Sequence, residues 1–215
     1  MNLLLVRHGE TAWNREGRYQ GRTDIPLSPD GEAQVAALST RLVEVPIDIA
    51  IASPLSRARS TAAAILGRRP LELELDERLL EISHGAWEGL LASDVQRDHA
   101  EMFGTWRSAP GRDVPAGPQA ETLGDVEVRA WAALEQVFAR LTGDQTALVV
   151  AHDAVNRVIL CRVLGLPLAR VWKFRQAPAA LNVLSGTSLD ELQIVRLNDS
   201  EHSSPLLRES LHRAL

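Results

Sequence analysis

Hydrophobic positions along the chain follow two periods, which predict strands and helices in turn. Mainly apolar runs at residues 3–6, 47–52 and 146–151 are typical of strands buried on both faces of a sheet. Helical spacing begins after Ser28-Pro29 and again after Ser53-Pro54, where a serine can cap a helix and a proline can occupy its first position. The pattern therefore predicts strands that alternate with helices.

Further segments complete this pattern. Thr122 can cap the most amphipathic helix, in which Val128 is expected to belong to the apolar stripe. Residues 71–75 alternate leucine with glutamate and predict a strand with one solvated face. Residues 180–184 and 192–197 flank a short turn and predict an antiparallel hairpin. Together they predict an α/β fold of three layers, α/β/α, with a mostly parallel central sheet and helices on both faces.

The length of the chain bears on its domain organisation. A chain of 215 residues fits one domain, which we expect to span residues 1–215. Residues 9–27 lack a sustained period and predict a long loop. Residues 85–120 predict a helical and loop excursion from the sheet that covers the functional site. The polar residues 198–215 predict a loosely held tail.

Charge and cysteine usage exclude several classes of function. The formal net charge of −5 argues against general nucleic-acid binding. Cys161 is the single cysteine and lies among apolar residues, so we expect a buried thiol and exclude an internal disulfide or a multi-cysteine zinc site. The opening apolar run is too short for a signal peptide or a membrane helix. We therefore expect a cytoplasmic protein that does not associate with membranes.

Cationic and imidazole side chains follow the predicted buried strands. Arg7 and His8 come directly after the first, Arg57 lies early in the helix after the second, and His152 follows the third. Because the carboxyl ends of parallel strands meet at one edge of a sheet, these side chains are expected to converge. Such a cluster in a protein of negative net charge indicates an anion-binding site. Phosphate is the natural candidate, since arginine forks match its oxygens.

The histidines and a carboxylate suggest more than phosphate binding. A neutral imidazole can attack phosphorus, and nearby arginines favour its neutral form. The arginines and the second histidine would then stabilise the charge on the phosphoryl oxygens. The leaving alkoxide needs a proton. Glu81 is the best-placed acid for this, with Glu10 and Glu88 as alternatives.

Four blocks of the sequence resemble the signature of the histidine phosphatase superfamily, the phosphoglycerate-mutase-like proteins. They are Arg7-His8-Gly9-Glu10-Thr11 with Asn14 and Gln20-Gly21 after it, Ser53-Pro54-Leu55-x-Arg57-Ala58, Leu80-Glu81 with Gly85-x-Trp87-Glu88-Gly89, and Val149-Val150-Ala151-His152. The blocks stand in the order of the family, and the resemblance covers nearly the whole chain.

The resemblance implies a role for each matching residue. It implies that His8 becomes phosphohistidine, and that Glu81 protonates the leaving group and later activates water. The residues that it implies in binding the phosphoryl group are Arg7, Arg57, His152 and Asn14. Gln20 and Gly21 match positions near the substrate. The resemblance implies that neither a metal nor another cofactor is needed.

The chain departs from the family pattern in its fourth block, where relatives commonly have His-Gly-Gly. Here the run is His152-Asp153-Ala154, in which Asp153 can bond a neighbouring backbone group or the imidazole and adds negative charge near an anion site. His84 is a candidate for binding the non-phosphate part of a substrate, for instance a carboxylate, or else an exposed loop histidine with no role. Trp87 and Trp106 are expected to pack rather than to bind ligand.

These observations favour a metal-independent phosphomonoester hydrolase that acts on a small phosphorylated metabolite. The alternative is a phosphoglycerate mutase, a branch that resembles a longer chain with Tyr-Gly-x-Leu-x-Gly-x-Asn-Lys after the acid. Residues 86–91 read Ala-Trp-Glu-Gly-Leu-Leu instead. A non-catalytic phospho-ligand binding module is disfavoured because every transfer residue is present. The identity of the metabolite stays open, and by analogy with relatives a homodimer is possible.

Overall fold

The computed structural model describes residues 1–203, and these contain one six-stranded sheet. The strands are β1 (Asn2–Arg7), β2 (Ile49–Ala52), β3 (Leu73–Leu75), β4 (Thr146–Ala151), β5 (Leu181–Ser185) and β6 (Gln193–Asp199). Their order is β3-β2-β4-β1-β5-β6. The pairs from β3 to β1 are parallel, whereas β5 and β6 are antiparallel to their neighbours. The mostly parallel sheet and the closing hairpin are as predicted.

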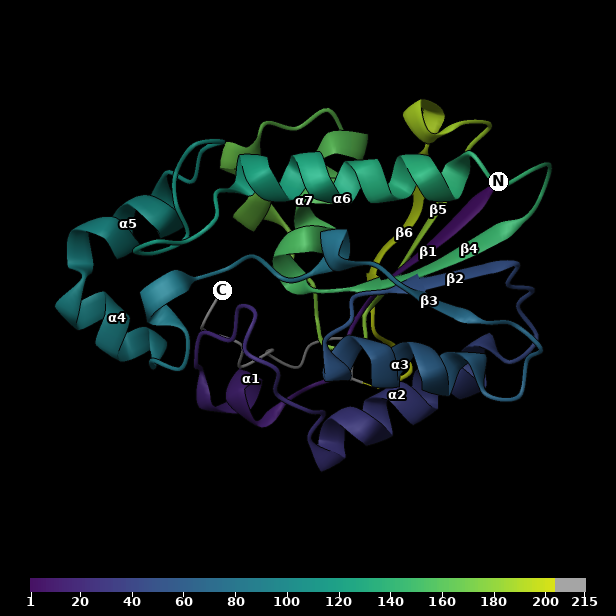
Figure 1. Cartoon of the computed structure of the whole chain (residues 1–215), viewed down its shortest axis with the longest axis horizontal. Coiled ribbons are helices and arrows are strands. Elements are labelled where there is room, and N and C mark those ends of the chain that lie inside the picture. The colour runs from purple at the N-terminus through teal and green to yellow at the C-terminus, as the bar shows by residue number, and fades with distance from the viewer. Residues whose placement is uncertain (204–215) are drawn as a thin grey trace.

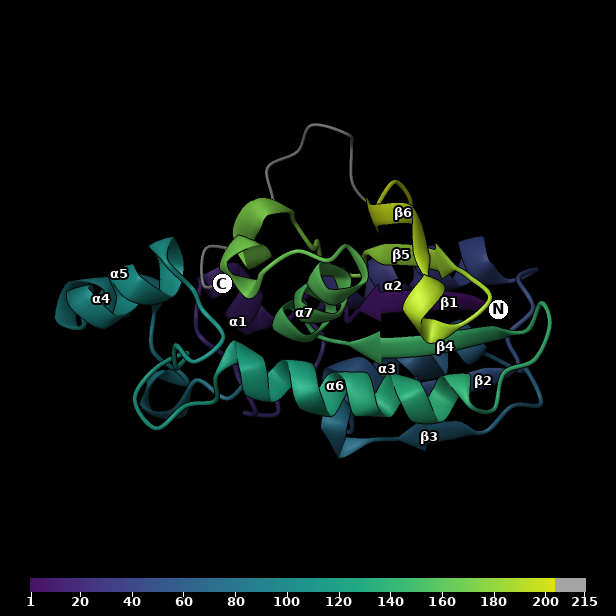
Figure 2. The ribbon, with the colours of Figure 1, turned by 90° about the horizontal axis from the view of Figure 1, so that it is seen from above.

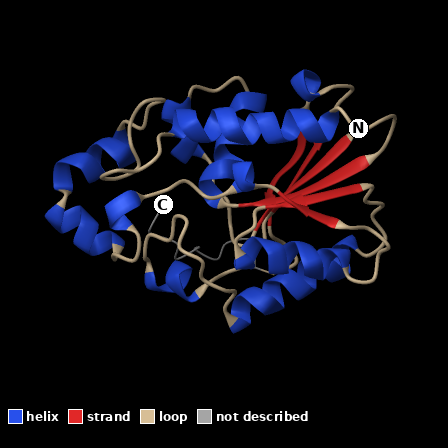
Figure 3. Ribbon diagram, viewed as in Figure 1, coloured by secondary structure: helices blue, strands red, loops and turns tan. Residues whose placement is uncertain are grey.

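Helices cover both faces of this sheet (Figure 3). On one face lie α2 (Pro29–Leu42) and α3 (Ser56–Leu66), and on the other lie α6 (Leu123–Phe138) and α7 (Asp153–Val163) (Figure 1). The shorter helices are α1 (Ala12–Glu16), α4 (Ala92–Asp98) and α5 (Ala100–Ser108). Single 3₁₀ segments occur at Glu77–Leu79, Gly85–Trp87, Leu168–Lys173 and Leu189–Glu191. The predicted three-layer α/β/α fold is confirmed.

Alternation along the buried strands builds two separate cores. Leu3 and Leu5 of β1 pack in the cluster that contains α6 and α7, whereas Leu4 and Val6 pack in the cluster that contains α2 and α3. Successive side chains of a strand point to opposite faces, so a strand covered on both faces must be apolar at every position. This explains why residues 3–6 form an unbroken apolar run. Cys161 is buried in the α6–α7 core, as expected.

Two helix starts differ from the sequence-based expectation. The loop predicted for residues 9–27 contains α1, which a reciprocal capping box between Thr11 and Asn14 stabilises. Helix α3 begins at Ser56 rather than at Pro54. Its first turn is capped by Asp24, whose carboxylate accepts hydrogen bonds from the Ser56 amide and hydroxyl at 2.8 Å each. The expected cap, Ser53, is bonded to another group described below.

Two further expectations are wrong. Val128 is 60% exposed and lies outside the apolar stripe of α6, which instead includes Val126, Trp131 and Leu134. Asn198 was assigned to a loose tail but lies in β6, where its amide N–H donates to Asn182 Oδ1 at 2.8 Å. Residues 204–215 of that predicted tail lie outside the described part of the chain.

Residues 85–120 leave the sheet and carry α4 and α5 beyond the carboxyl ends of the strands (Figures 1 and 2). Trp87 and Trp106 anchor this excursion with fully buried indole rings, so their expected packing role is confirmed. In the range 1–203, no helix combines the length and the apolarity needed to cross a bilayer.

Candidate active site

The register of the parallel strands brings three chain segments together at one edge of the sheet. Arg7 pairs with Ala151, and Ala52 pairs with Val150, so β1, β4 and β2 end side by side. The residues that follow these strands are His8, His152 and Ser53. The convergence expected at the carboxyl ends of the strands is therefore present.

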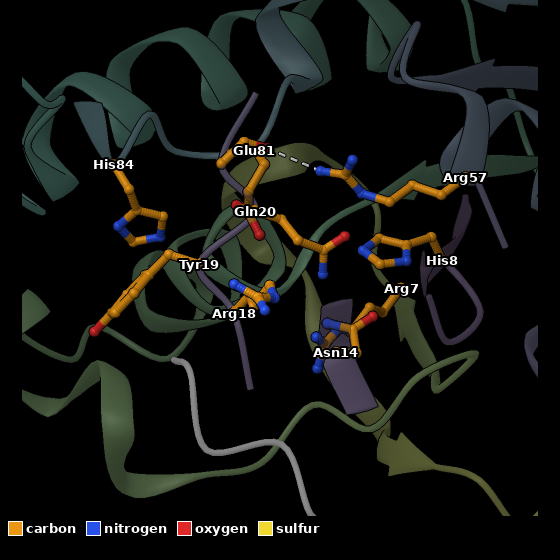
Figure 4. Close-up of a pocket in the computed structure, with 10 residues that line it drawn as sticks. Arg7, His8, Asn14, Arg18, Tyr19, Gln20, Arg57, Glu81 and His84 are labelled. Carbon is orange, nitrogen blue, oxygen red and sulfur yellow. Dashed lines mark hydrogen bonds between the residues drawn. The ribbon is translucent and has the colours of Figure 1, made fainter. Parts of the chain in front are cut away.

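A cavity at this edge is lined by side chains from the whole first half of the chain (Figure 4). Its lining residues are Arg7, His8, Asn14, Arg18, Tyr19, Gln20, Gly21, Arg57, Glu81 and His84. Every candidate site residue lines it except His152, whose ring lies against that of His8 with centroids 5.1 Å apart. The structure thus brings all nine candidates together.

His8 presents one defined nitrogen for chemistry. Its Nδ1 lies 2.7 Å from the carbonyl oxygen of Gly9, which can only accept a hydrogen bond. Nδ1 therefore carries the proton in the neutral imidazole, and Nε2 keeps its lone pair. The backbone on both sides is fixed, since the His8 amide donates to Ala151 and the His8 carbonyl accepts from Ala179.

His152 is held by Ser53, the residue that the sequence assigns to a helix cap. Its Nε2 lies 2.7 Å from Ser53 Oγ, while its buried Nδ1 has no hydrogen-bond partner in the described range. Burial, together with the positive charge of Arg57, holds the pKa of His152 well below its usual range, so the ring is neutral. When the Ser53 hydroxyl donates to Nε2, the proton of the imidazole resides on Nδ1.

Arg57 is anchored by backbone carbonyls. Its Nη1 donates to Thr23 and its Nη2 to Gly21, both at 2.9 Å. Gly21 has a φ of 53°, a left-handed conformation that glycine adopts without strain. Burial lowers the pKa of Arg57 to about 10, so the side chain stays charged at neutral pH.

Arg7 is anchored by a carboxylate. Its Nη1 donates to Asp153 Oδ1 at 2.9 Å and also to the carbonyl of Gln176. The Nε atoms of Arg7 and Arg57 are both buried and lack a partner among residues 1–203. Two oriented guanidinium groups with such donors favour an anionic ligand.

Glu81 is the carboxyl group of the cavity, and its surroundings favour the protonated form. Burial and the nearby Asp153 raise its pKa, whereas the Ile82 amide, Arg57 and Arg7 oppose that rise. Its Oε1 accepts from the Ile82 amide at 2.9 Å. A buried, protonated carboxyl group can act as a general acid.

The alternative acids have other partners. Glu10 pairs with Arg15 at 2.6 Å, and Glu88 accepts hydrogen bonds from the amides of Arg22, Thr23 and His84. Neither residue lines the cavity. Glu81 is therefore the acid that the geometry favours.

Asn14 and Gln20 are oriented through one hydroxyl group. Thr11 Oγ1 lies 3.1 Å from Asn14 Oδ1 and 2.9 Å from Gln20 Oε1. Because the amide oxygens face Thr11, their NH₂ groups remain to donate to a ligand. Both residues line the cavity (Figure 4).

His84 lines the part of the cavity beside Tyr19, whose ring centroid is 4.6 Å from that of His84 (Figure 4). The expected alternative of an exposed loop histidine is wrong, because the side chain is fully buried. Its Nδ1 bonds the Ala116 carbonyl at 2.8 Å, and burial lowers its pKa to about 4. His84 is therefore neutral with the proton on Nδ1, and Nε2 can only accept. Such a nitrogen can accept from a hydroxyl or ammonium donor but has no proton to donate to the carboxylate that the sequence suggested.

Comparison with known proteins places the chain in a family. The sequence model of the histidine phosphatase superfamily (branch 1) matches residues 3–200. The chain belongs to this superfamily. The resemblance inferred from the four sequence blocks is confirmed, and it extends over the central sheet and the cavity.

Individual members of the histidine phosphatase superfamily align over most of the chain. Phosphoserine phosphatase 1 of Hydrogenobacter thermophilus is 34% identical over 215 residues, which is 100% of both chains. Adenosylcobalamin/alpha-ribazole phosphatase of Escherichia coli (strain K12) is 31% identical and covers 81% of this chain and 85% of its own. Among solved structures, Bacillus stearothermophilus YhfR superposes with a TM-score of 0.86 at 30% identity, covering 94% of this chain and 99% of its own.

Sequence reasoning missed several residues of this histidine phosphatase site. Arg18 and Tyr19 line the cavity from the segment between α1 and Gln20, where no periodicity distinguishes them from loop residues. Ser53 was assigned to a cap, although its place directly after a strand is the same signal that identified His8. Sequence reasoning also missed the ion pairs of Asp153 with the guanidinium groups of Arg7 and Arg157.

Proposed function

We propose that this protein hydrolyses phosphomonoesters of small metabolites through a phosphohistidine formed on His8. The observation that carries this proposal is the hydrogen bond from His8 Nδ1 to Gly9, because it leaves Nε2 as a nucleophile beside two buried arginines. The phosphatase relatives support the same reaction class.

In the first step, His8 Nε2 attacks phosphorus while the bond between phosphorus and the ester oxygen breaks. Arg7, Arg57, Asn14 and the Nδ1–H of His152 donate to the phosphoryl oxygens, whose charge is greatest in the transition state. Glu81 transfers its proton to the departing alkoxide, so the alcohol leaves neutral.

In the second step, Glu81 is a carboxylate and accepts a proton from water. The water oxygen attacks phosphorus, the bond between phosphorus and nitrogen breaks, and its electron pair returns to His8 Nε2. Inorganic phosphate leaves, with His8 neutral and Glu81 protonated as at the start. Neither step uses a metal ion.

The non-phosphate part of the cavity indicates a class of substrate. His84 Nε2 accepts hydrogen bonds, whereas Arg18 and the Gln20 amide donate them. We therefore propose a phosphomonoester whose alcohol part bears a hydroxyl or ammonium donor together with acceptor oxygens. Phosphoserine, named for one relative, has this chemistry, and so does α-ribazole phosphate, named for another.

A panel of phosphorylated metabolites, compared by kcat/KM for phosphate release, tests this function. The matched variant is His8→Ala, which should abolish release for every compound. Unchanged release would favour a binding module whose apparent activity comes from a contaminant. The mutase alternative is tested with 3-phosphoglycerate, with and without a bisphosphoglycerate primer. Primer-dependent isomerisation that outpaces phosphate release would overturn the proposal.

Three expectations stay predictions. They are a single domain with residues 85–120 covering the site, a cytoplasmic location, and a homodimer. The lining residues of the cavity all lie outside residues 85–120, although one of them, His84, directly precedes that segment.

A further inference from the structure

We propose that Asp153 is a positioning residue for phosphoryl transfer, whose carboxylate bridges Arg7 and Arg157 and thereby orients the Arg7 guanidinium toward the phosphoryl group. This inference rests on the proposed function. It concerns the position at which the chain departs from the His-Gly-Gly pattern.

The first part of the argument is the contact with Arg7. Asp153 is the first residue of α7, directly after His152, and is 1% exposed. Its Oδ1 accepts from Arg7 Nη1 at 2.9 Å, and the carbonyl of Gln176 accepts from the same nitrogen. A guanidinium group is planar and rigid, so fixing Nη1 sets the direction of its other N–H bonds. The contact therefore also fixes the direction of the Arg7 Nε–H bond, which has no partner among residues 1–203, and Arg7 lines the cavity.

The second part is the contact with Arg157, one helical turn along α7. Asp153 Oδ2 accepts from Arg157 Nε at 2.6 Å. Arg157 Nη1 donates to the carbonyl of Val171 at 3.2 Å and to that of Phe174. The guanidinium also lies over the ring of Trp172, 5.3 Å from its centroid. Asp153 is therefore itself held in place, by an arginine tied to the segment that follows α7.

The third part is charge. Arg7 and Arg157 are both buried, and a carboxylate between them compensates two desolvated cations at once. A glycine at position 153 would leave Arg7 with only the neutral carbonyl of Gln176 among these partners. Donors that are oriented before the reaction stabilise a transition state more than donors that must reorganise. Asp153 thus supplies the orientation of Arg7.

A double-mutant cycle with Asp153→Asn and Arg7→Lys tests this proposal. The two arginines bond different oxygens of Asp153, and in asparagine one of these oxygens is replaced by an NH₂ group that cannot accept, so one of the two contacts is lost. We expect D153N to lower kcat/KM and orthovanadate affinity by about 10-fold in the wild-type background, which is less than the roughly 100-fold that a misplacement of about 1 Å can cost. In the R7K background, where no guanidinium remains to be oriented, D153N should change both by less than about 2-fold.

The control variant is Asp94→Asn, which also removes a first-turn acid from a helix but is not among the residues that line the cavity. It should match the wild type. The positioning role would be overturned if D153N lowered kcat/KM and vanadate affinity equally in both backgrounds, or lowered them in neither. If Asp153 had only a structural role, D153N would lower the midpoint of thermal unfolding, and its effect on kcat/KM would not depend on whether residue 7 is arginine.

Orthovanadate binding, measured by calorimetry, separates this proposal from the proposed function. If the wild type binds vanadate but releases no phosphate from any ester, the proposed hydrolase function is wrong. The role of Asp153 is still decided by the vanadate affinities measured in the double-mutant cycle. A wild type that does not bind vanadate would overturn both. If D153N does not fold, a double variant that combines Asp153→Gly with Arg157→Met takes the place of D153N in the same cycle. This double variant removes both buried charges together.

Discussion

The imidazole of His152 lies edge-on to that of His8, with 5.1 Å between the ring centroids and 60° between the ring planes. The two rings come from residues that are 144 positions apart and meet because β1 and β4 are neighbouring parallel strands. Nδ1 of His8 bonds the carbonyl of Gly9, and Nε2 of His152 bonds the hydroxyl of Ser53. The proposed mechanism gives the two histidines different roles, His8 as the nucleophile and His152 as a hydrogen-bond donor.

Ser53→Ala tests whether Ser53 keeps the proton of His152 on Nδ1. In the proposed mechanism the Ser53 hydroxyl donates to His152 Nε2 and keeps the imidazole proton on Nδ1, so its loss should lower kcat/KM by about 10-fold, less than the roughly 100-fold typical of removing an oxyanion donor itself. Ser53→Thr keeps the hydroxyl and should retain most of the activity. Ser39→Ala is the control, because its hydroxyl bonds the Ala64 carbonyl on the surface. Equal activity of S53A and wild type would show that Ser53 does not set the tautomer.

Glu81→Gln tests the acid. Because burial raises the pKa of Glu81, its proton is retained to higher pH than that of an ordinary glutamate, and kcat/KM should fall only as pH rises through this raised pKa. E81Q should remove that alkaline limb and lower kcat about 100-fold or more for alkyl phosphates. Phosphorylation of His8 by p-nitrophenyl phosphate, whose leaving group needs no proton, should be slowed much less. Similar slowing with both esters would argue against acid catalysis by Glu81.

Much of this site follows from the sequence through one geometric rule. His8, Arg57 and His152 were predicted to converge because parallel strands end at a common edge, and the sheet order places them there. The bond from Arg7 to Asp153 joins residues 146 positions apart, and no local pattern indicates it. Asp153 and Arg157, by contrast, are four positions apart on a helix, a spacing at which ion pairs form and that the sequence already contained.

The starts of the helices also show that local sequence patterns miss tertiary contacts. Ser28 and Thr122 cap the helices that they precede, since each bonds the amide three positions later. Ser53 is followed by proline as Ser28 is, but it lies beside the buried imidazole of His152, and that tertiary contact replaces the cap. Val128 was misassigned because α6 is buried on only one side, and a periodic pattern alone did not fix the boundary of its apolar stripe.

His84 should make the fold sensitive to acid. Its native pKa of about 4 lies below the unfolded value of 6.5, so the unfolded chain binds the proton first as pH falls. Its contribution to stability is complete above about pH 6.5 and is lost on acidification, by roughly 3 kcal/mol at pH 4. Urea unfolding of the wild type and His84→Gln across this range measures the effect. The wild type should lose stability more steeply than H84Q, and parallel curves would contradict the buried neutral imidazole.

The central claim is that phosphate passes through His8. The direct measurement is a rapid alkaline quench of the protein mixed with radiolabelled p-nitrophenyl phosphate, followed by peptide mapping. The account predicts a label that is stable to alkali and labile to acid, located on His8 and absent from His8→Ala. Steady phosphate release by the wild type with no label on His8 at any quench time would contradict it.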